Sequence, residues 1–386
     1  MATRTKILLV AGTRPNFMKV FPVMRAVEKW NSCEHAGKRP GVAFDQILVH
    51  TGQHHDRAMS DVFFEDLGMS EPDHRLGAHG DSQVRQIAEV MVALEPILMT
   101  ERPALVIVVG DVSSTLAAAL TAAKLNLPVA HIEAGLRSGD RAMPEEINRI
   151  LTDAVSTLLF ATCRDAIDNL AIEGIVGERV AFVGNPMIDT LEAFRDKARK
   201  RDTLSKLGLT PGGYVLATLH RPSNVDDPVQ LASLCEVIMA LADERPVVFP
   251  VHTRTKMRLE AADDGSRLLG SPNVRVTGPL GYLDFVSLMA QARLVLTDSG
   301  GVQEETTVLG VPCLTVRTTT ERPVTVSEGT NRLVDPYDPG AVLAAALSAV
   351  REPPSATTGA PKRPELWDGH AANRIVVTIA EWVAGR

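Results

Sequence analysis

The sequence predicts an α/β protein of two Rossmann-like lobes, each a parallel sheet covered by helices. Its 386 residues exceed the usual size of one domain and suit two domains of about 150–200 residues. Short apolar runs alternate with helical stretches along most of the chain. The apolar runs are continuous, as in parallel strands buried on both faces, which favours this fold class over sandwiches and barrels.

The first half of the chain alternates predicted strands and helices in a βαβ series. Continuous apolar runs predict strands at Ile7–Val10, Gln46–Val49, Leu105–Val109, Val129–Ile132 and Leu158–Ala161. Helical stretches between them lie at Phe17–Trp30, Gln83–Leu98 and Ser114–Leu125. Right-handed crossovers and a doubly wound sheet follow from this order.

The second half repeats the pattern after a pause near residues 183–186. We interpret the charged segment 195–201 as a solvated helix face rather than a binding patch. Residues 352–364 predict a loop, and the amphipathic segment Ala371–Val383 could cross back onto the first lobe. The expected lobes are residues 1–184 with 371–386, and residues 185–370. Strands of the second lobe are predicted at Tyr214–Leu219, Val247–Val251, Val274–Val276, Leu294–Thr297 and Cys313–Val316.

The composition limits the classes of partner. A net charge of −7 and a pI near 5.8 argue against a general nucleic-acid or membrane-surface binder. No apolar stretch approaches the roughly 20 residues that span a bilayer, and the first apolar run is shorter than a signal-peptide core. The four cysteines form no CxxC pair and are expected to be reduced thiols. We therefore expect a cytoplasmic protein.

Unusual residue clusters follow most of the predicted strands. In an open parallel sheet, the loops after the carboxyl ends of the strands form the ligand crevice. Clusters of this kind occur in both halves, at residues 12–16, 51–55, 110–111, 133–135, 220–222, 252 and 298–301. Two such crevices facing one another would make an interdomain site, so we expect the ligand in a cleft between the lobes.

The segment Asp298–Glu305 follows a predicted strand and opens a helix. Gly300 and Gly301 let the backbone approach an anion, and Ser299 can cap a helix whose free N–H groups favour phosphate. A structural turn explains the same pattern equally well. The segment lacks the Gly-x-Ser-x-Gly pattern of a nucleophile elbow.

The turn after the first strand, Gly12-Thr13-Arg14, lacks the Gly-Lys-Ser/Thr ending of a Walker loop. Arg14 and Lys19 nevertheless supply cations at the exit of this strand, where a diphosphate could lie. This turn is therefore a second candidate for anion binding.

Four carboxylates lie near predicted strand ends or a helix start: Asp111, Glu133, Glu145 and Glu146. Carboxylates that converge on one crevice repel one another unless they bind cations or move protons. Asp111 is equally well explained as a structural turn residue. Glu145 and Glu146 follow Pro144 and also suit a helix N-terminus, where they complement the dipole. Structural and functional roles both remain open at this point.

Five histidines between residues 50 and 79 invite a metal hypothesis. No zinc-type spacing with cysteine or carboxylate accompanies them, so we expect no metal site. His220, at a strand end before Arg221, is the better functional candidate. We interpret His131, inside an apolar strand, as a core residue whose polar atoms are satisfied.

The ordered set of motifs resembles one family, the non-hydrolysing UDP-N-acetylglucosamine 2-epimerases. The resemblance extends from about residue 5 to about residue 380 with compatible spacing. Each motif is modest alone, but the set is specific. The motifs are Gly12-Thr13-Arg14-Pro15, Val109-Gly110-Asp111, His131-Ile132-Glu133-Ala134-Gly135-Leu136-Arg137, Pro144-Glu145-Glu146-x-Asn148-Arg149, His220-Arg221, Asp298-Ser299-Gly300-Gly301-x-Gln303-Glu304-Glu305 and Thr320-Glu321-Arg322-Pro323.

The resemblance implies a GT-B-like architecture, with UDP bound by the second lobe, and a homodimer. It implies conversion of UDP-N-acetylglucosamine (UDP-GlcNAc) to UDP-N-acetylmannosamine (UDP-ManNAc) without NAD or an essential metal. By motif position, the catalytic set is Asp111, Glu133, Glu145 and His220. The residues expected to grip UDP are Arg14, Lys19, Arg149, Phe285, Ser299, Gly300, Gly301 and Glu305.

The implied chemistry suits these residue types. The C2 proton is not α to a carbonyl, so simple deprotonation is implausible, whereas anti loss of UDP with the C2 proton gives 2-acetamidoglucal. Syn re-addition of UDP, with protonation from the other face, gives the epimer and needs two acid/base groups. Cations and a helix N-terminus would stabilise the charge on the departing diphosphate. Glu305 is suited to accept both ribose hydroxyls, and Phe285 to pack near the nucleotide.

Some positions depart from the family pattern. Asn16 stands where many members have Glu, so contacts near Arg14 are expected to differ. Some members bind a second UDP-GlcNAc as an allosteric activator; Gln53 and His252 fit that site, but its arginine has no clear counterpart. The alternatives are a 2-epimerase of a modified sugar, such as a UDP-diacetamido uronic acid, and a GT-B glycosyltransferase. The carboxylate set argues against the glycosyltransferase.

Overall fold

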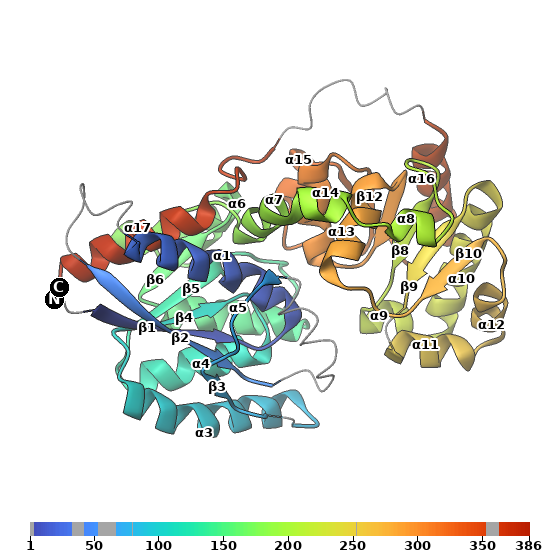
Figure 1. Cartoon of the computed structure of the whole chain (residues 1–386). Coiled ribbons are helices and arrows are strands. Elements are labelled where there is room, and N and C mark those ends of the chain that lie inside the picture. The colour runs from blue at the N-terminus through green and yellow to red at the C-terminus, as the bar shows by residue number, and fades with distance from the viewer. Residues whose placement is uncertain (1–3, 33–41, 53–66, 79, 252, 353–362) are drawn as a thin grey trace. The chain divides into compact units, whose positions relative to one another are not determined.

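Two compact units make up the chain (Figure 1). The computed structural model describes residues 4–32, 42–52, 67–78, 80–251, 253–352 and 363–386. Unit 1 comprises Met1–Thr190 and Glu365–Arg386, and unit 2 comprises Leu191–Pro364. The lobe limits expected from the sequence are 184/185 and 370/371, whereas the chain passes between the units at 190/191 and 364/365.

Unit 1 is built on a sheet of seven described strands, all paired in parallel. Their order is β3-β2-β1-β4-β5-β6-β7, which reverses direction between β1 and β4. Doubly wound folds bind their ligands at such a switch point. The strands are β1 (Arg4–Ala11), β2 (Ala43–His50), β3 (His74–Arg75), β4 (Leu105–Val109), β5 (Val129–Ala134), β6 (Leu158–Ala161) and β7 (Val180–Phe182).

Helices cover both faces of this sheet, with α1 and α17 on one face and α3 and α4 on the other (Figure 1). Helix α7 contains the limit between the two units. The described helices are α1 (Arg14–Asn31), α3 (Gln83–Glu101), α4 (Ser113–Lys124), α5 (Pro144–Val155), α6 (Arg164–Ile172), the 3-10 turn η2 (Gly177–Arg179), α7 (Pro186–Arg199) and α17 (Ala371–Ala384).

The C-terminal segment is anchored in unit 1 by polar contacts as well as by packing. The Asp189 carboxylate accepts hydrogen bonds from the backbone N–H groups of Ala371 and Ala372, at 3.1 and 2.7 Å. These bonds satisfy free donors at the start of α17. Trp367 is fully buried and donates its indole N–H to the carbonyl oxygen of Thr162 at 2.9 Å.

Unit 2 has a second parallel sheet of six described strands, in the order β10-β9-β8-β11-β12-β13. Its strands are β8 (Val215–Thr218), β9 (Val247–Pro250), β10 (Val274–Thr277), β11 (Leu294–Thr297), β12 (Cys313–Val316) and β13 (Asn331–Val334). Its helices are α8 (Thr203–Lys206), α9 (Pro222–Val225), α10 (Pro228–Glu244), α11 (Thr253–Glu260), α12 (Asp263–Leu269), α13 (Tyr282–Gln291), α14 (Gly300–Leu309), α15 (Val324–Ser327) and α16 (Pro339–Arg351).

The predicted fold class of two Rossmann-like α/β lobes is confirmed, and its physical basis is the buried apolar run. Every residue of β4, Leu105–Val109, is buried, and so is every residue of β11, Leu294–Thr297. Strands covered on both faces bury successive side chains alike, which is why these runs are continuous. Helix α5 begins at Pro144, as the sequence predicts.

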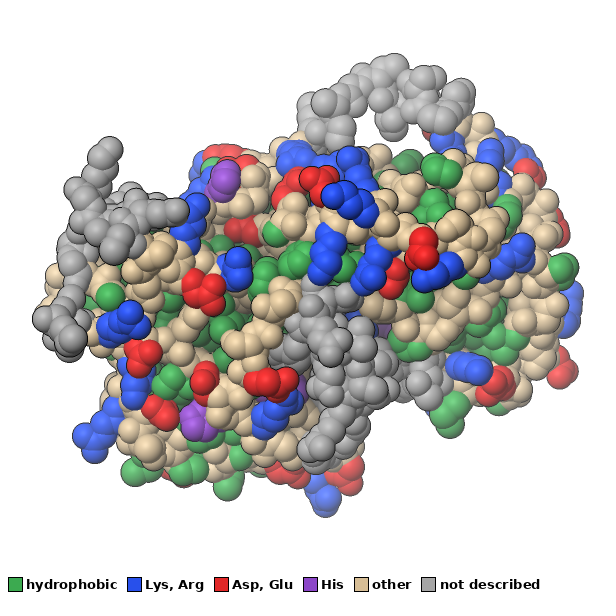
Figure 2. Space-filling view, in the orientation of Figure 1, with side chains coloured by type: hydrophobic (Ala, Val, Ile, Leu, Met, Phe, Trp, Pro, Cys, Tyr) green, Lys and Arg blue, Asp and Glu red, His purple; other side chains and the backbone are tan. Residues whose placement is uncertain are grey.

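Charged side chains lie mainly on the surface. Acidic and basic side chains are interspersed on the face drawn in Figure 2. The charged run 195–201 is mostly exposed, with Ala198 buried, so it is a solvated face of α7 and the residues after it. Among the described residues, no helix combines the length and apolar character needed to cross a membrane.

Candidate active site

The strands that carry the predicted carboxylates of unit 1 are neighbours in its sheet. β1, β4 and β5 pair side by side and in parallel, so their carboxyl ends lie on one edge. Gly12 follows β1, Asp111 follows β4, and Glu133 lies near the end of β5. The structure thus brings together these strand-end residues, as expected from the sequence.

Glu133 forms an ion pair with Lys19 of α1, and both side chains are buried. Its backbone has φ +73°, a left-handed conformation, and the pairing of β5 with β6 shifts register between Ile132 and Ala134. Such strain costs on the order of 1–3 kcal/mol and persists only where the surroundings hold it. The Glu133 carboxylate and the Lys19 ammonium group therefore lie together at the end of β5.

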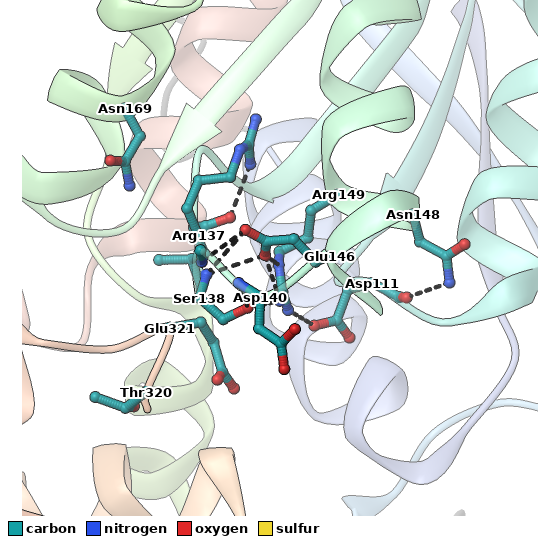
Figure 3. A network of polar contacts seen from close by, with 12 residues as sticks. Asp111, Arg137, Ser138, Asp140, Glu146, Asn148, Arg149, Asn169, Thr320 and Glu321 are labelled. Atoms are coloured by element: carbon teal, nitrogen blue, oxygen red, sulfur yellow. Dashed lines mark hydrogen bonds and ion pairs between the residues drawn. The ribbon is translucent and has the colours of Figure 1, made fainter. Parts of the chain in front are cut away.

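Asp111 is held by Arg149 of α5 through a second ion pair, drawn in Figure 3. The Asn148 side chain donates to the backbone carbonyl of Asp111 at 2.8 Å. The Arg149 guanidinium is buried and also donates to Glu146, at 3.0 Å from Nε and 2.7 Å from Nη2. Arg149, predicted among the UDP-binding residues, therefore contacts two carboxylates of unit 1.

Glu146 fixes the loop before α5. Its carboxylate accepts the backbone N–H groups of Ser138 and Gly139, each at 2.9 Å (Figure 3). Burial alone would raise the pKa of Glu146, but these N–H groups and the Arg149 guanidinium outweigh it and hold the pKa below its ordinary value. Its neighbour Glu145, predicted to be catalytic, is half-buried in the first turn of α5.

Asn16 organises the turn after β1, at the position where the sequence departs from the family pattern. Its side-chain oxygen accepts the N–H groups of Gly12 and Thr13, at 3.1 and 3.0 Å. Its side-chain nitrogen donates to the carbonyl oxygen of Val109, at the end of β4, at 3.0 Å. Asn16 thus joins two strand ends, beside the half-buried Arg14.

In unit 2, a buried aspartate orients His220. Asp298 accepts the backbone N–H groups of His220 and Arg221, at 3.0 and 2.9 Å, and its Oδ1 lies 2.7 Å from His220 Nδ1. Burial would raise the pKa of Asp298, but His220 and these donors hold it below its ordinary value. The His220 side chain remains 53% exposed, so its position suits proton transfer.

The N-terminus of α14 has the form of an anion site. Ser299 occupies the capping position without a side-chain capping bond, and the first turn contains no acidic residue. A Cβ added to Gly300 would lie 2.5 Å from Arg322 Nη1 and 2.8 Å from Glu321 Oε1, so a larger residue would require these side chains to shift. The N–H groups of a helix N-terminus beside glycine favour phosphate, whereas Arg322 is paired with Glu304 and Glu321. Gly301 follows in the same turn.

Glu305 lies on α14, is buried, and accepts a hydrogen bond from the Tyr282 hydroxyl of α13 at 3.0 Å. Burial raises the pKa of Glu305 to about 8, and the nearby Glu304 adds to the shift, while the Tyr282 bond opposes it. Phe285 lies one turn after Tyr282 on α13 and is half-buried.

Other predicted residues lie elsewhere. Gln53 and His252 fall outside the described residues. His131 is fully buried with both ring nitrogens beside oxygen atoms, as predicted for a satisfied core residue. Within the described ranges, no group of three His, Cys, Asp or Glu side chains could hold a metal ion.

A family model described as UDP-N-acetylglucosamine 2-epimerase matches residues 38–380. The chain belongs to the UDP-N-acetylglucosamine 2-epimerase family. Membership makes it an enzyme, an epimerase of the non-hydrolysing type. The UDP-N-acetylglucosamine 2-epimerase of Methanocaldococcus jannaschii is 39% identical over 334 residues, covering 85% of this chain and 88% of that protein.

One further relative bears on the substrate, and one solved structure bears on the fold. The UDP-2,3-diacetamido-2,3-dideoxy-D-glucuronate 2-epimerase of Pseudomonas aeruginosa is 43% identical over 333 residues, 85% of this chain and 88% of that protein. A crystal structure of the M. jannaschii epimerase in complex with UDP-GlcNAc and UDP matches with a TM-score of 0.86 and 36% identity, covering 98% of this chain and 100% of that one. The GT-B-like fold expected of this epimerase family is thereby confirmed.

Sequence reasoning named Glu146 among the four carboxylates and Asp298 at the start of the α14 segment, but it assigned neither to the catalytic or UDP-binding set, and it did not name Tyr282. Glu146 and Arg149 are three residues apart on a helix that begins at Pro144, and this spacing could have indicated their contact. The position of Asp298, directly after the apolar strand Leu294–Thr297, could have indicated its role. We find no sequence signal for Tyr282.

Proposed function

We propose that this epimerase interconverts UDP-GlcNAc and UDP-ManNAc by eliminating and re-adding UDP. The bond from C1 to the phosphate oxygen breaks with its electron pair on UDP. The C2–H electrons form the C1=C2 bond of 2-acetamidoglucal, and a protein base takes the proton. UDP then re-adds at C1 while C2 receives a proton from the opposite face. The observation that carries this proposal is the presence of two carboxylate–cation pairs at one sheet edge, in a chain of this family.

Stereochemistry requires two acid/base groups. In the α-linked gluco sugar, H2 lies anti to the leaving group, whereas in the manno sugar it lies on the same side. One group must therefore face each side of C2, and Asp111 and Glu133 are our candidates. Each forms an ion pair with a basic side chain, Glu133 with Lys19 and Asp111 with Arg149. Glu145 and His220 are candidates for further proton transfer.

We assign UDP to unit 2. The α14 N-terminus, with Ser299, Gly300 and Gly301, would take the diphosphate, with Arg14 and Lys19 stabilising the departing charge. With a pKa of about 8, Glu305 is mostly neutral at pH 7 without ligand. Two ribose hydroxyls donating to it would favour the carboxylate, so nucleotide binding should release a proton. Phe285 would pack near the nucleotide.

A specific observation favours a second substrate. The P. aeruginosa relative, which epimerises a diacetamido glucuronate sugar, is 43% identical, against 39% for the M. jannaschii UDP-GlcNAc enzyme. Both substrates share UDP and the C2 centre, so the residues above serve either. Measuring kcat/KM for both sugars with one preparation separates the candidates, because the preferred substrate should exceed the other by at least about tenfold.

The reaction is tested by incubation with UDP-GlcNAc in D2O followed by NMR. Epimerisation through C2 predicts deuterium at C2 of the product, with traces of glycal and UDP. A preparation that binds UDP but gives neither turnover nor exchange with either sugar would contradict the proposed function.

The acid/base roles are tested by two isosteric variants. Asp111→Asn and Glu133→Gln remove the proton acceptor and keep the shape, so each should abolish C2 exchange. UDP should still bind, as measured by calorimetry, because Ser299, Glu305 and Phe285 of unit 2 are unchanged in these variants. Unimpaired exchange in either variant would remove that residue from the mechanism.

We also propose that a second copy of the chain is the partner. Helix α3 exposes Val84, Val92 and Met99, with 77%, 74% and 60% of their surfaces accessible, and these side chains follow one stripe of the helix. An exposed apolar stripe of this kind is typical of an interface. Light scattering should report a dimer, and Val92→Glu should convert it to monomers; a monomeric wild-type protein would contradict the proposal.

A further inference from the structure

His131 lies in β5 with its side chain fully buried between two oxygen atoms. Nδ1 is 2.6 Å from Asp153 Oδ1, and Nε2 is 2.9 Å from the carbonyl oxygen of Gly110. A carbonyl oxygen only accepts, so Nε2 carries a proton. Asp153 Oδ2 accepts from Gly135 N–H and lies 2.8 Å from Arg137 Nη2, and this cation favours the carboxylate form, so we assign the second proton to Nδ1. The geometry describes a buried imidazolium.

The surrounding charges compensate this imidazolium. Arg137 Nη2 lies 2.8 Å from Asp153 Oδ2 and 2.7 Å from Glu173 Oε2, so two cations face two anions. Burial would raise the pKa of Asp153, but His131 and Arg137 outweigh it and hold the pKa below its ordinary value. Buried charges persist when they are paired and hydrogen-bonded in this way.

Asp153 holds the chain on both sides of Glu133. One carboxylate oxygen binds the side chain of His131, two residues before Glu133, and the other accepts Gly135 N–H, two residues after it, at 3.0 Å. The left-handed conformation of Glu133 costs about 1–3 kcal/mol. A clamp spanning the turn offsets this cost and fixes the direction of the Glu133 side chain.

The other ring nitrogen acts on the second carboxylate. The carbonyl that accepts from His131 Nε2 belongs to Gly110, whose φ of +70° makes the turn directly before Asp111. A Cβ on Gly110 would lie 3.2 Å from Glu133 Oε2 and 3.7 Å from Lys19 Nζ, so this turn is packed against the other carboxylate–cation pair. One imidazole therefore joins the two backbone turns that carry both carboxylates.

We propose that His131, held as an imidazolium by Asp153, is a positioning residue that sets the geometry of Glu133 and Asp111. This inference rests on the proposed function. His131 is completely buried, so it acts through the two carboxylates and does not touch the sugar.

Two variants separate the two bonds of the ring. The amide nitrogen of His131→Asn replaces Nδ1 and keeps the bond to Asp153, whereas that of His131→Gln replaces Nε2 and keeps the bond to Gly110. Each variant loses one of the two hydrogen bonds of the ring and the positive charge of the imidazolium. A displacement of about 1 Å at reacting groups costs on the order of 100-fold in rate, so we expect kcat to fall about 10–100-fold. KM and the affinity for UDP should change less than about threefold, since neither depends on this geometry.

The pH–rate profile distinguishes positioning from a purely structural role. Moving either carboxylate relative to its cation changes the proton affinity of that carboxylate. The limbs of the kcat profile against pH should therefore shift. His74→Asn is the matched control, because His74 is a half-buried histidine of unit 1 that pairs with Glu101 at 3.3 Å. It should leave kcat and the profile unchanged.

The protonation of His131 can also be measured in the wild-type protein, so this test does not depend on a folded variant. After 15N labelling of histidine, one slowly exchanging imidazole should keep two N–H protons at neutral pH. The absence of such a ring would overturn the inference. So would folded His131 variants with wild-type kcat, or with reduced kcat and an unshifted pH profile. If the wild-type protein does not exchange the C2 proton of the sugar, that result counts against the proposed function. The 15N histidine spectrum tests the imidazolium independently of that result.

Discussion

Substitution of Lys19, the cation beside Glu133, should destabilise unit 1 more than any substitution of an exposed residue. In Lys19→Met, a carboxylate that is 3% exposed loses its ion-pair partner. Removing one partner of a buried ion pair in this way costs about 3–5 kcal/mol. For a unit of this size, that loss lowers the melting temperature by roughly 6–20 °C. All three tryptophans of the chain, Trp30, Trp367 and Trp382, lie in unit 1, so tryptophan fluorescence during urea unfolding reports this unit.

Two controls make this prediction sharp. Lys6→Met breaks the partly exposed pair with Glu101, at 2.8 Å, and should cost less than about 1 kcal/mol. The double variant Lys19→Met/Glu133→Gln removes both charges and should recover most of the stability. The deficit of Lys19→Met should grow as the pH rises above about 4.3, because protonated Glu133 is the form that tolerates burial. A loss no larger than that of Lys6→Met, or a double variant as unstable as the single one, would refute the reasoning.

Two further predictions concern other parts of the chain. Burial raises the pKa of Glu305 to about 8, so its protonated form stabilises unit 2 below about pH 4.5, and this contribution is lost as the pH rises towards 8. Urea unfolding followed by tyrosine absorbance, which reports unit 2, should show this decline, and Tyr282→Phe should extend it to higher pH; a flat profile would contradict it. Gly184→Ala should destabilise unit 1 by more than about 2 kcal/mol, because Gly184 has φ +83° and a Cβ there would lie 2.1 Å from the carbonyl oxygen of Leu366. Tryptophan fluorescence during unfolding measures this loss, and wild-type stability would contradict the prediction.

The strands found from the sequence are the central ones, together with the edge strand β10. Continuous apolar runs mark strands covered on both faces, and the sheets place β4 and β11 there. The strands that sequence reasoning missed, β3, β7 and β13, all lie at sheet edges. β3 has two residues, and β13 begins with the polar pair Asn331-Arg332, so neither presents an apolar run.

The candidate site was predictable as a set of strand-end residues but not as a set of contacts. Parallel strands bring Asp111 and Glu133 to one edge whatever their partners. The pairing of each with Arg149 or Lys19 depends on side-chain directions from α5 and α1, which spacing alone does not specify. The clamp formed by Asp153 was missed because an aspartate in an amphipathic helix resembles a surface residue in sequence.

The central claim is that UDP leaves C1 before C2 is reprotonated. It is tested most directly with UDP-GlcNAc carrying 18O in the oxygen that joins C1 to phosphorus. Freed UDP can rotate its terminal phosphate before re-adding, so 18O should move to non-bridging positions in the recovered sugar nucleotide while C2 acquires solvent deuterium. Label that stays entirely in the bridging position, in material that has exchanged at C2, would contradict the account.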